Sequence, residues 1–312
     1  MTTTDTSAPE AEAWRSRLDP ERTTPIALAG LRILFGLLWM QSAGWKVPPH
    51  FEALRNQTRL AIDHEVFRPW TWFVRHVVLE HFSVFGWLTL IVEATLGALL
   101  LVGLATRMAA IAGAGLALFI GLTVLDAPGE WGWSYWMLIV GHLVLAATAA
   151  GRHAGVDGLL TRGDPGPGDA AGRQASARRF LAVLCGLATS AAIYGIVAAR
   201  TVAFTAERGR IILLRDDDWF VGDLLQLNGL GAVVYAALGA VGAVAAWRGW
   251  RRVVVATGVA FGLLAVQVLV QLGRSTNWLG AQRGGNLTLC GALTVCLFLL
   301  APPRPADGAG SS

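Results

Sequence analysis

A single carboxylate lies within an otherwise apolar stretch of the chain. Glu93 is near the middle of LTLIVEATLGALLLVGLATR, residues 88–107. An ionisable group inside a membrane segment costs at least ~2.5–3.5 kcal/mol, so it normally faces protein or water and has a partner. Two basic side chains in the same half of the sequence are candidates, Arg32 in LAGLRILFG and His142 in MLIVGHLVL. We therefore predict that Glu93, Arg32 and His142 meet in one site.

The positions of these three residues along their segments support a shared site. Counting about 1.5 Å per helical residue from the outer ends places Glu93 and His142 at a similar depth, and the long side chain of Arg32 covers the remaining difference. A carboxylate and an imidazole at one depth can exchange protons with a substrate that is oxidised or reduced, which would make the three residues catalytic. The alternative is a buried ion pair and a hydrogen-bonded histidine that only fix helix packing.

The composition shows that the elements carrying these residues cross a membrane. Hydrophobic residues make up 54% of the 312 residues and charged residues 15%, which lies outside the range of an ordinary soluble domain. A hydrocarbon core of about 30 Å requires roughly 20 residues per helix. Eight apolar runs approach that length, at 25–46, 84–105, 108–126, 132–150, 180–200, 229–247, 253–272 and 285–302. They lack the alternation of barrel strands, so we predict an all-α integral membrane protein.

The remaining sequence divides these runs into two groups of four. The stretch TRGDPGPGDAAGRQASARR at 161–179 is rich in Gly, Pro, Ala and charge, which predicts a cytoplasmic linker between two four-helix bundles. The two halves share their order of elements, so a parallel repeat is one alternative. The expected regions are a cytoplasmic disordered tail at 1–24, membrane domains at 25–160 and 180–302, and a cytoplasmic tail at 303–312.

The basic residues next to helix ends predict the orientation. WRGWRR at 247–252 and ARR at 177–179 are dense and adjoin predicted spans. By the positive-inside rule these ends are cytoplasmic, which places both termini on the cytoplasmic side of the inner membrane. The basic residues form no contiguous face, so a nucleic-acid partner is not expected.

The predicted outer side is rich in aromatic residues. Residues 47–83 have apolar positions at helical spacing among charges, as an interfacial amphipathic helix would. Aromatic rings at this level either form the usual belt or line a lipid-accessible pocket for a flat ring such as a quinone. On the second interpretation Lys46 attracts a small anion, and the substrate-binding residues are Lys46, Trp45, Trp133 and Tyr135.

The sequence predicts no resident metal or redox cofactor. The three cysteines lie inside predicted spans and form no CxxC pair, so we expect buried thiols. A single deep histidine supplies at most one haem ligand, and we find no flavin or iron–sulfur motif. Quinone is expected only as a substrate.

Three motifs, taken in order, resemble the DoxX/DoxD family of four-helix membrane proteins. They are LRILFGLLWMQSAGWKV, FGWLTLIVEATLGALLLVGLATRMAA and WSYWMLIVGHLVLAATAAGRHAGVDGLL. The family-like positions are Gly97, Arg107, Gly151, Arg152 and Asp157. The resemblance covers residues 25–160, and the wording WGWSYWM favours the DoxD-like branch, the small subunit of thiosulfate:quinone oxidoreductase.

The resemblance implies a redox function at the membrane. A protein of this branch would take part in oxidising a small anionic sulfur compound at the outer face and passing the electrons to quinone, directly or through a redox partner subunit. DoxX relatives also serve as membrane components of redox-protective complexes. The alternative function is a non-catalytic scaffold or anchor, or a channel-like component for a small solute. Residues 180–302 lie outside the resemblance.

Overall fold

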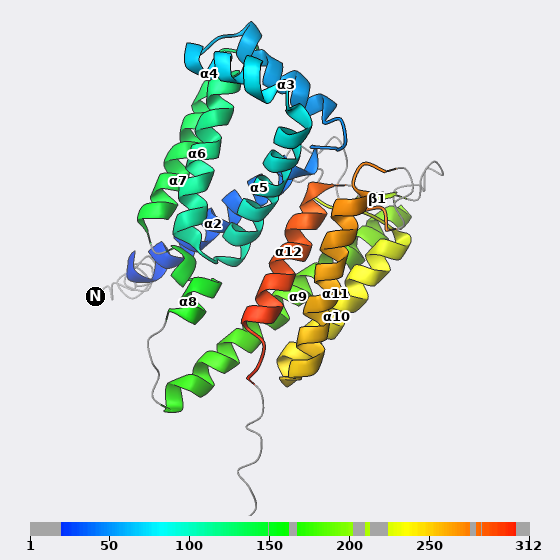
Figure 1. Ribbon diagram of the computed structural model, residues 1–312. Helices are drawn as coiled ribbons and strands as arrows, with labels where there is room; N and C mark the ends of the chain where they lie inside the picture. The colour runs from blue at the N-terminus through cyan, green and yellow to red at the C-terminus, as the bar shows by residue number, and fades with distance from the viewer. Residues whose placement is uncertain are drawn as a thin grey trace, which may run out of the picture.

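The chain folds into a set of long helices with short connections (Figure 1). The computed structural model describes residues 20–148, 150–161, 167–201, 210–212, 224–274, 279–281 and 283–303. The helices are α2 (Pro20–Gly44), α3 (Glu52–Asp63), α4 (Arg68–Phe73), the π-helix η1 (Val74–Val78), α5 (Phe82–Val102), α6 (Thr106–Val124), α7 (Gly132–Ala147), the 3-10 helix η2 (Ala150–Arg152), α8 (Val156–Leu160), α9 (Pro167–Thr201), α10 (Gly229–Arg248), α11 (Arg251–Gln271) and α12 (Gly284–Leu299). A two-stranded antiparallel ladder joins β1 (Arg210–Ile212) to β2 (Gln226–Asn228). The predicted terminal tails lie almost entirely outside the described residues.

The prediction of an all-α membrane protein is confirmed. Within the described residues six helices are long and apolar enough to cross a bilayer, namely α2, α5, α6, α9, α10 and α11. The other two apolar helices, α7 and α12, lie at predicted spans but have 16 residues each, which gives a length of about 24 Å. The chain is therefore a multi-pass membrane protein with six candidate spans and two shorter apolar helices.

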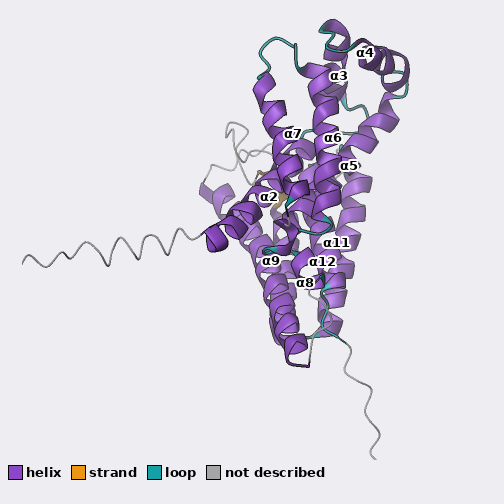
Figure 2. Cartoon of the chain, turned by 90° about the vertical axis from the view of Figure 1, so that its left-hand side faces the viewer, coloured by secondary structure: helices purple, strands orange, loops and turns teal. Residues whose placement is uncertain are grey.

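The helices form two neighbouring groups, and α12 joins them. Helices α2, α5, α6 and α7 form the first group, and α9 to α12 form the second (Figure 1). Figure 2 shows α3 and α4 at one end of the molecule and α8 toward the other. Helix α12 packs on α5 and α2 because glycines remove the side chains between them. A Cβ on Gly284 would overlap the carbonyl oxygen of Ala43, and a Cβ on Gly97 would lie 3.0 Å from the methyl carbon of Thr288.

Most of the predicted linker is helical. Helix α9 begins at Pro167, inside the stretch 161–179 for which the composition predicts a linker. Proline is compatible with the first turn of a helix because its missing N–H has no intrahelical partner there. The residues that follow, DAAGRQASARR, include strong helix formers, and these continue the helix to the membrane span. The connection between the two groups is thus shorter than its composition predicts.

The predicted interfacial segment lies across one end of the first group, formed by α3, α4 and η1 (Figure 1). Its apolar face packs on protein. Phe51 is 1% exposed and meets the ring of Trp87 edge-on, with centroids 5.6 Å apart. The indole N–H of Trp70 donates a hydrogen bond to Thr123 on α6, at 3.1 Å. We call this the α3 end of the bundle; it is the side that the sequence predicts to be outside.

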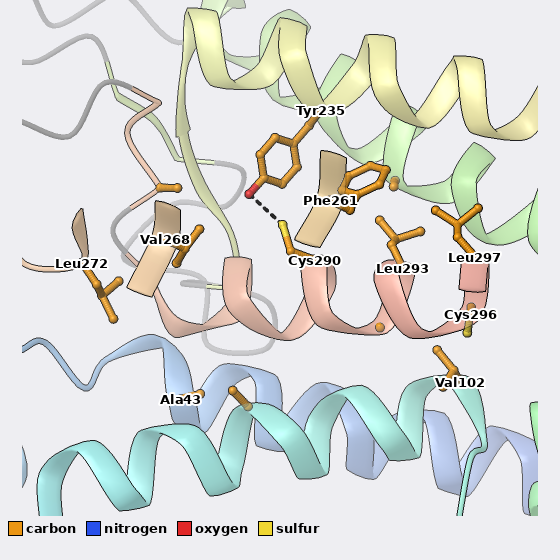
Figure 3. Close-up of a cluster of buried hydrophobic side chains, with 14 of the residues drawn as sticks. Ala43, Val102, Tyr235, Phe261, Val268, Leu272, Cys290, Leu293, Cys296 and Leu297 are labelled. Atoms are coloured by element: carbon orange, nitrogen blue, oxygen red, sulfur yellow. Dashed lines mark hydrogen bonds between the residues drawn. The ribbon is translucent and has the colours of Figure 1, made fainter. Parts of the chain in front are cut away.

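The second group has an apolar core with few polar side chains (Figure 3). Tyr235 lies among Phe261, Leu293 and Leu297, and its hydroxyl is 3.1 Å from the sulfur of Cys290. All three cysteines are free and buried, at the positions for which buried thiols are expected. The second group packs against the first group mainly through α12.

Candidate functional site

The partner of Glu93 is Lys46. Oε2 of Glu93 lies 2.6 Å from Nζ of Lys46, and the two side chains are 0% and 2% exposed. The ammonium group also donates to the backbone oxygen and the hydroxyl of Ser42, at 2.7 and 3.1 Å. An ammonium carries three hydrogens, so these three acceptors occupy all of them. A substrate anion would have to displace one of the three before it could bind Lys46.

Geometry at the end of α2 explains why this lysine reaches a buried carboxylate. Helix α2 ends at Gly44, and Lys46 follows in the next turn. Its side chain returns along the last helical turn to Ser42, which brings the charge to the level of Glu93 on the antiparallel helix α5. The ring of Trp45 lies 4.1 Å from Nζ and adds a cation–π contact.

Helix α12 covers the ion pair from the side of the second group. Leu90 and Gly97 are one turn to either side of Glu93 on α5. A Cβ on Gly284 of α12 would lie 2.7 Å from Leu90, and Thr288 of the same helix is next to Gly97. Oε1, the second oxygen of Glu93, is buried here and has no hydrogen-bond partner among the described residues. The site is therefore a dry junction of α2, α5 and α12.

Arg32 does not reach Glu93, although the sequence predicts that it does. Nη1 of Arg32 donates to the carbonyl oxygens of Leu100 and Leu101, at 2.8 and 3.2 Å, and Nη2 donates to that of Ala154, at 3.0 Å. Leu100 is seven residues beyond Glu93, or about 10 Å along the helix axis. The guanidinium satisfies carbonyl groups at the end of α5 that have no intrahelical partner. The prediction that Arg32 belongs to one site with Glu93 is therefore wrong.

His142 also has partners of its own. Nε2 accepts a hydrogen bond from the indole N–H of Trp39, at 2.8 Å, and Nδ1 lies 2.7 Å from the carbonyl oxygen of Leu138. The ring is 0% exposed and meets Phe35 edge-on. Gly113 on α6 allows this placement, because a Cβ there would overlap the imidazole. Both ring nitrogens are thus engaged, and Glu93 is not among their partners.

The family-like positions at the other end of the bundle form one tight structure. We call it the motif end, residues 103–107 and 150–160. The carboxylate of Asp157 accepts the backbone N–H groups of Ala105 and Thr106 at 2.7 and 3.0 Å, and so caps the start of α6. A Cβ on Gly151 would overlap the side chains of Asp157 and Thr106. Arg107 and Arg152 are exposed next to this cap.

The remaining predicted binding residues are separate from the ion pair. Trp133 is 58% exposed and stacks on Trp131, with centroids 5.8 Å apart. The hydroxyl of Tyr135 donates to Glu130, at 2.6 Å. Of the four predicted substrate-binding residues, the structure brings only Trp45 and Lys46 into contact. Within the described residues, no group of three or more metal-ligating side chains is found.

Three features of the site were not predicted from the sequence. Ser42 holds the lysine, and its position four residues before Lys46, at the end of α2, could have indicated this contact. Trp39 holds His142 across two helices, and α12 covers the pair from the other half of the chain. Neither contact has a local signal in the sequence, because both depend on how the helices pack.

A cavity of about 240 Å³ lies between α5, α11 and α12. Its walls are apolar except for Thr95, and include Ala94, Ala98, Leu269 and Leu287. The α5 residues on its wall, among them Ile91, Thr95 and Val102, lie on the face of the helix roughly opposite Glu93, so the helix separates the cavity from the carboxylate. An apolar ring or chain is the chemistry that such a wall accommodates.

The chain was compared with known proteins, and neither a curated protein nor a solved structure matches it. One family model does match, and the matched segment includes Glu93, His142 and the motif end, but not Arg32 or Lys46. The match spans about a third of the chain. Residues 64–164 match the model described as the TQO small subunit DoxD, which confirms a DoxD-like resemblance over that range.

Proposed function

We propose that this protein is a membrane subunit of a quinone-linked oxidoreductase, and that it helps to pass electrons from a small anionic sulfur compound to quinone. The family match supports this proposal, because the model describes a small subunit of such an enzyme. A small subunit also implies a partner subunit, through which the electrons would reach quinone if they do not pass directly from the substrate.

One observation within the structure carries the site assignment. Glu93 is fully buried, its Oε2 is paired with Lys46, and its Oε1 is free of hydrogen bonds among the described residues. Reduction of quinone to quinol takes two electrons and two protons. A buried carboxylate with one free oxygen is suited to hold such a proton. In this proposal Glu93 handles protons at the junction of α2, α5 and α12.

The other predicted residues take different roles in this proposal. Lys46 stabilises the ionised form of the Glu93 carboxylate, because a neighbouring positive charge favours that form. Arg32 and His142 position the helices, since both Nη atoms of Arg32 are bonded to backbone carbonyl groups and the imidazole is bonded to Trp39 and Leu138.

A non-catalytic anchor is the second candidate, and one observation favours it. His142 and Lys46 satisfy their buried donors and acceptors within the protein, and both Nη atoms of Arg32 donate to backbone carbonyl groups, as side chains with a purely structural role do. In that case the protein would hold a catalytic partner in the membrane, and Glu93 would matter only for folding.

Thiosulfate-dependent reduction of a soluble quinone analogue distinguishes the two candidates. Membranes that contain the protein and its co-purified partners should show the activity, and Glu93→Gln should remove most of it. Glu65→Gln is a matched control, because Glu65 is an exposed carboxylate paired with Arg68 on the surface. The double variant Lys46→Met with Glu93→Leu separates folding from chemistry, because it removes both charges together.

Three results would decide against the redox assignment. Full activity in the folded double variant would remove Glu93 from the mechanism. Activity that follows only the amount of folded protein across all variants would favour the anchor. A complex that reduces quinone equally well without this subunit would also exclude the proposed role.

A further inference from the structure

A second cavity lies at the motif end, far from the ion pair. Its volume is about 230 Å³, and it lies between the start of α6, η2 and α8. The lining residues are Ala105, Thr106, Arg107, Met108, Thr148, Gly151, Arg152, Asp157 and Thr161. The proposed redox function uses none of them.

Hydrogen-bond donors without acceptors converge on this cavity. Thr106 is 1% exposed, and its Oγ1 has no hydrogen-bond partner among the described residues. Oγ1 of Thr148 is also buried and unpartnered there. Arg107 and Arg152 line the same cavity, and in the described part of the chain neither has a carboxylate within salt-bridge distance. Buried hydroxyl groups such as those of Thr106 and Thr148 normally have a hydrogen-bond partner, so their lack of one indicates a missing acceptor in the cavity.

The charge of the cavity is positive despite its one carboxylate. Both oxygens of Asp157 already accept backbone N–H groups, from Ala105 and Thr106. The carboxylate also lies at the start of α6, where the helix dipole compensates a negative charge. The two guanidinium groups therefore leave an excess positive charge that is open to an anion.

The place of the cavity at the end of a candidate span predicts that it lies at the level of lipid headgroups. The candidate span in α6 starts at Thr106, which lines the cavity. Met108, also on the wall, is 70% exposed, and Leu160 on α8 is 50% exposed. Apolar side chains at the rim of a basic site would contact acyl chains while the arginines contact the headgroup.

We propose that this cavity binds the phosphate group of an anionic phospholipid. Arginine is the side chain best suited to phosphate, because its planar donors match two phosphate oxygens at once. Arg107 and Arg152 would supply those donors, and Thr106 and Thr148 would donate their hydroxyl hydrogens to the remaining oxygens. Basic pockets at the ends of membrane helices bind anionic lipids by the same chemistry.

Lipid binding to the purified full-length protein tests this proposal. Native mass spectrometry would measure the bound fraction as phosphatidylglycerol, phosphatidylcholine or inorganic phosphate is titrated into protein in detergent. Phosphatidylglycerol should bind more tightly than the other two. The double variant Arg107→Gln with Arg152→Gln should weaken that binding by about 25-fold, since one basic side chain near an anionic lipid contributes roughly fivefold. Arg252→Gln is the matched control, because Arg252 is exposed at the start of α11, away from the cavity.

Each result bears on the proposal. Equal binding of the two phospholipids by the unaltered protein would overturn it, whether or not the double variant folds. Inorganic phosphate that binds as tightly as phosphatidylglycerol would overturn the lipid assignment and indicate a free phosphate site. A loss of binding in Arg252→Gln as large as in the double variant would show a general effect of charge, and the proposal would fail.

Discussion

At the scale of single residues, the ion pair shows how a membrane protein holds one charge on each of two helices. Lys46 and Glu93 are both excluded from solvent, and the three hydrogens of the ammonium are all bonded. Removing one partner from a buried pair leaves an uncompensated charge, whereas removing both together does not. Either charge without the other would therefore destabilise the folded protein.

Stability measurements on the pair should show this coupling. Lys46→Met and Glu93→Leu should each destabilise the protein by about 3–5 kcal/mol, because each leaves one buried charge. The double variant should lose much less than the sum. Thermal unfolding of the purified protein in detergent gives all four values. Losses that simply add would show that the two groups do not interact.

The contact between Trp39 and His142 supports a second prediction at this scale. His142→Phe leaves the indole N–H buried without an acceptor, which costs about 1–3 kcal/mol. Trp39→Phe with His142→Phe should cost less than the two single changes combined. The matched control is His76→Phe, since His76 is exposed and should change stability by less than about 0.5 kcal/mol. An equal loss in both histidine variants would contradict the structural role of His142.

The sequence predicted the burial of Glu93 and its need for a basic partner, but it did not identify that partner. The burial follows from one charge in a long apolar run. The partner depends on the register between α2 and α5, and on a lysine side chain that returns along its own helix after the helix has ended. Counting the depth of each residue along its own helix reveals neither the register between two helices nor the path of a side chain. The count of depth therefore predicted Arg32 and His142 as partners, but these residues bond to Leu100 and to Trp39 instead.

At the scale of elements, glycines and one aspartate determine how the helices meet at the motif end. Gly103 follows the last residue of α5 with a φ of 68°, which glycine adopts readily, and Asp157 then caps the start of α6 by accepting the N–H groups of Ala105 and Thr106. Arg32 satisfies the carbonyl groups at the end of α5. The motif recognised from the sequence is thus a joint that fixes four helices at one end.

A pair of glycine substitutions tests this joint. Gly151→Ala should destabilise the protein by about 1–3 kcal/mol, because the new Cβ overlaps Asp157 and Thr106. Gly115→Ala on α6 is the control, since a Cβ there meets no atom within 4 Å, and it should be neutral or stabilise by about 0.5–1 kcal/mol. Chemical or thermal unfolding would compare them. If Gly151→Ala is as stable as the control, the tight packing at the motif end is not required.

The helices themselves were predictable, because hydrophobic runs of membrane length are a strong signal in any sequence. The start of α9 was not, since the glycines and prolines of 161–179 outweighed the helix-forming residues among them. The short lengths of α7 and α12 were also missed, because the apolar runs continue past the points where these helices end.

At the scale of the whole molecule, the number of membrane crossings sets the side of each end. If α7 and α12 cross together with the six longer helices, the start of α2 and the end of α12 lie on one side, as their positions in Figure 1 indicate. The turn between α10 and α11 then lies on that same side, and the α3 end lies on the other.

Labelling of introduced cysteines tests this topology. The three native cysteines are buried, so they should contribute little background. In intact cells a membrane-impermeant maleimide should label Val47→Cys at the α3 end, and should label Arg252→Cys and Pro303→Cys only after lysis. Labelling of Pro303→Cys in intact cells would show that α12 or α7 does not cross. Labelling of both Arg252→Cys and Pro303→Cys in intact cells, without labelling of Val47→Cys, would reverse the predicted orientation.

The placement of α12 sets an order for biosynthesis. This helix leaves the ribosome after α2 and α5, yet Gly284 and Thr288 cover the junction that holds Lys46 and Glu93 in the first half. Until α12 is inserted, the newly made first half lacks one wall, and its ion pair lacks protection from lipid and water. We therefore expect that the first group, α2, α5, α6 and α7, does not mature as an independent domain, even though domains generally fold in the order of their synthesis. Premature termination anywhere before residue 284 would leave an open polar junction in the membrane that quality-control proteases could recognise.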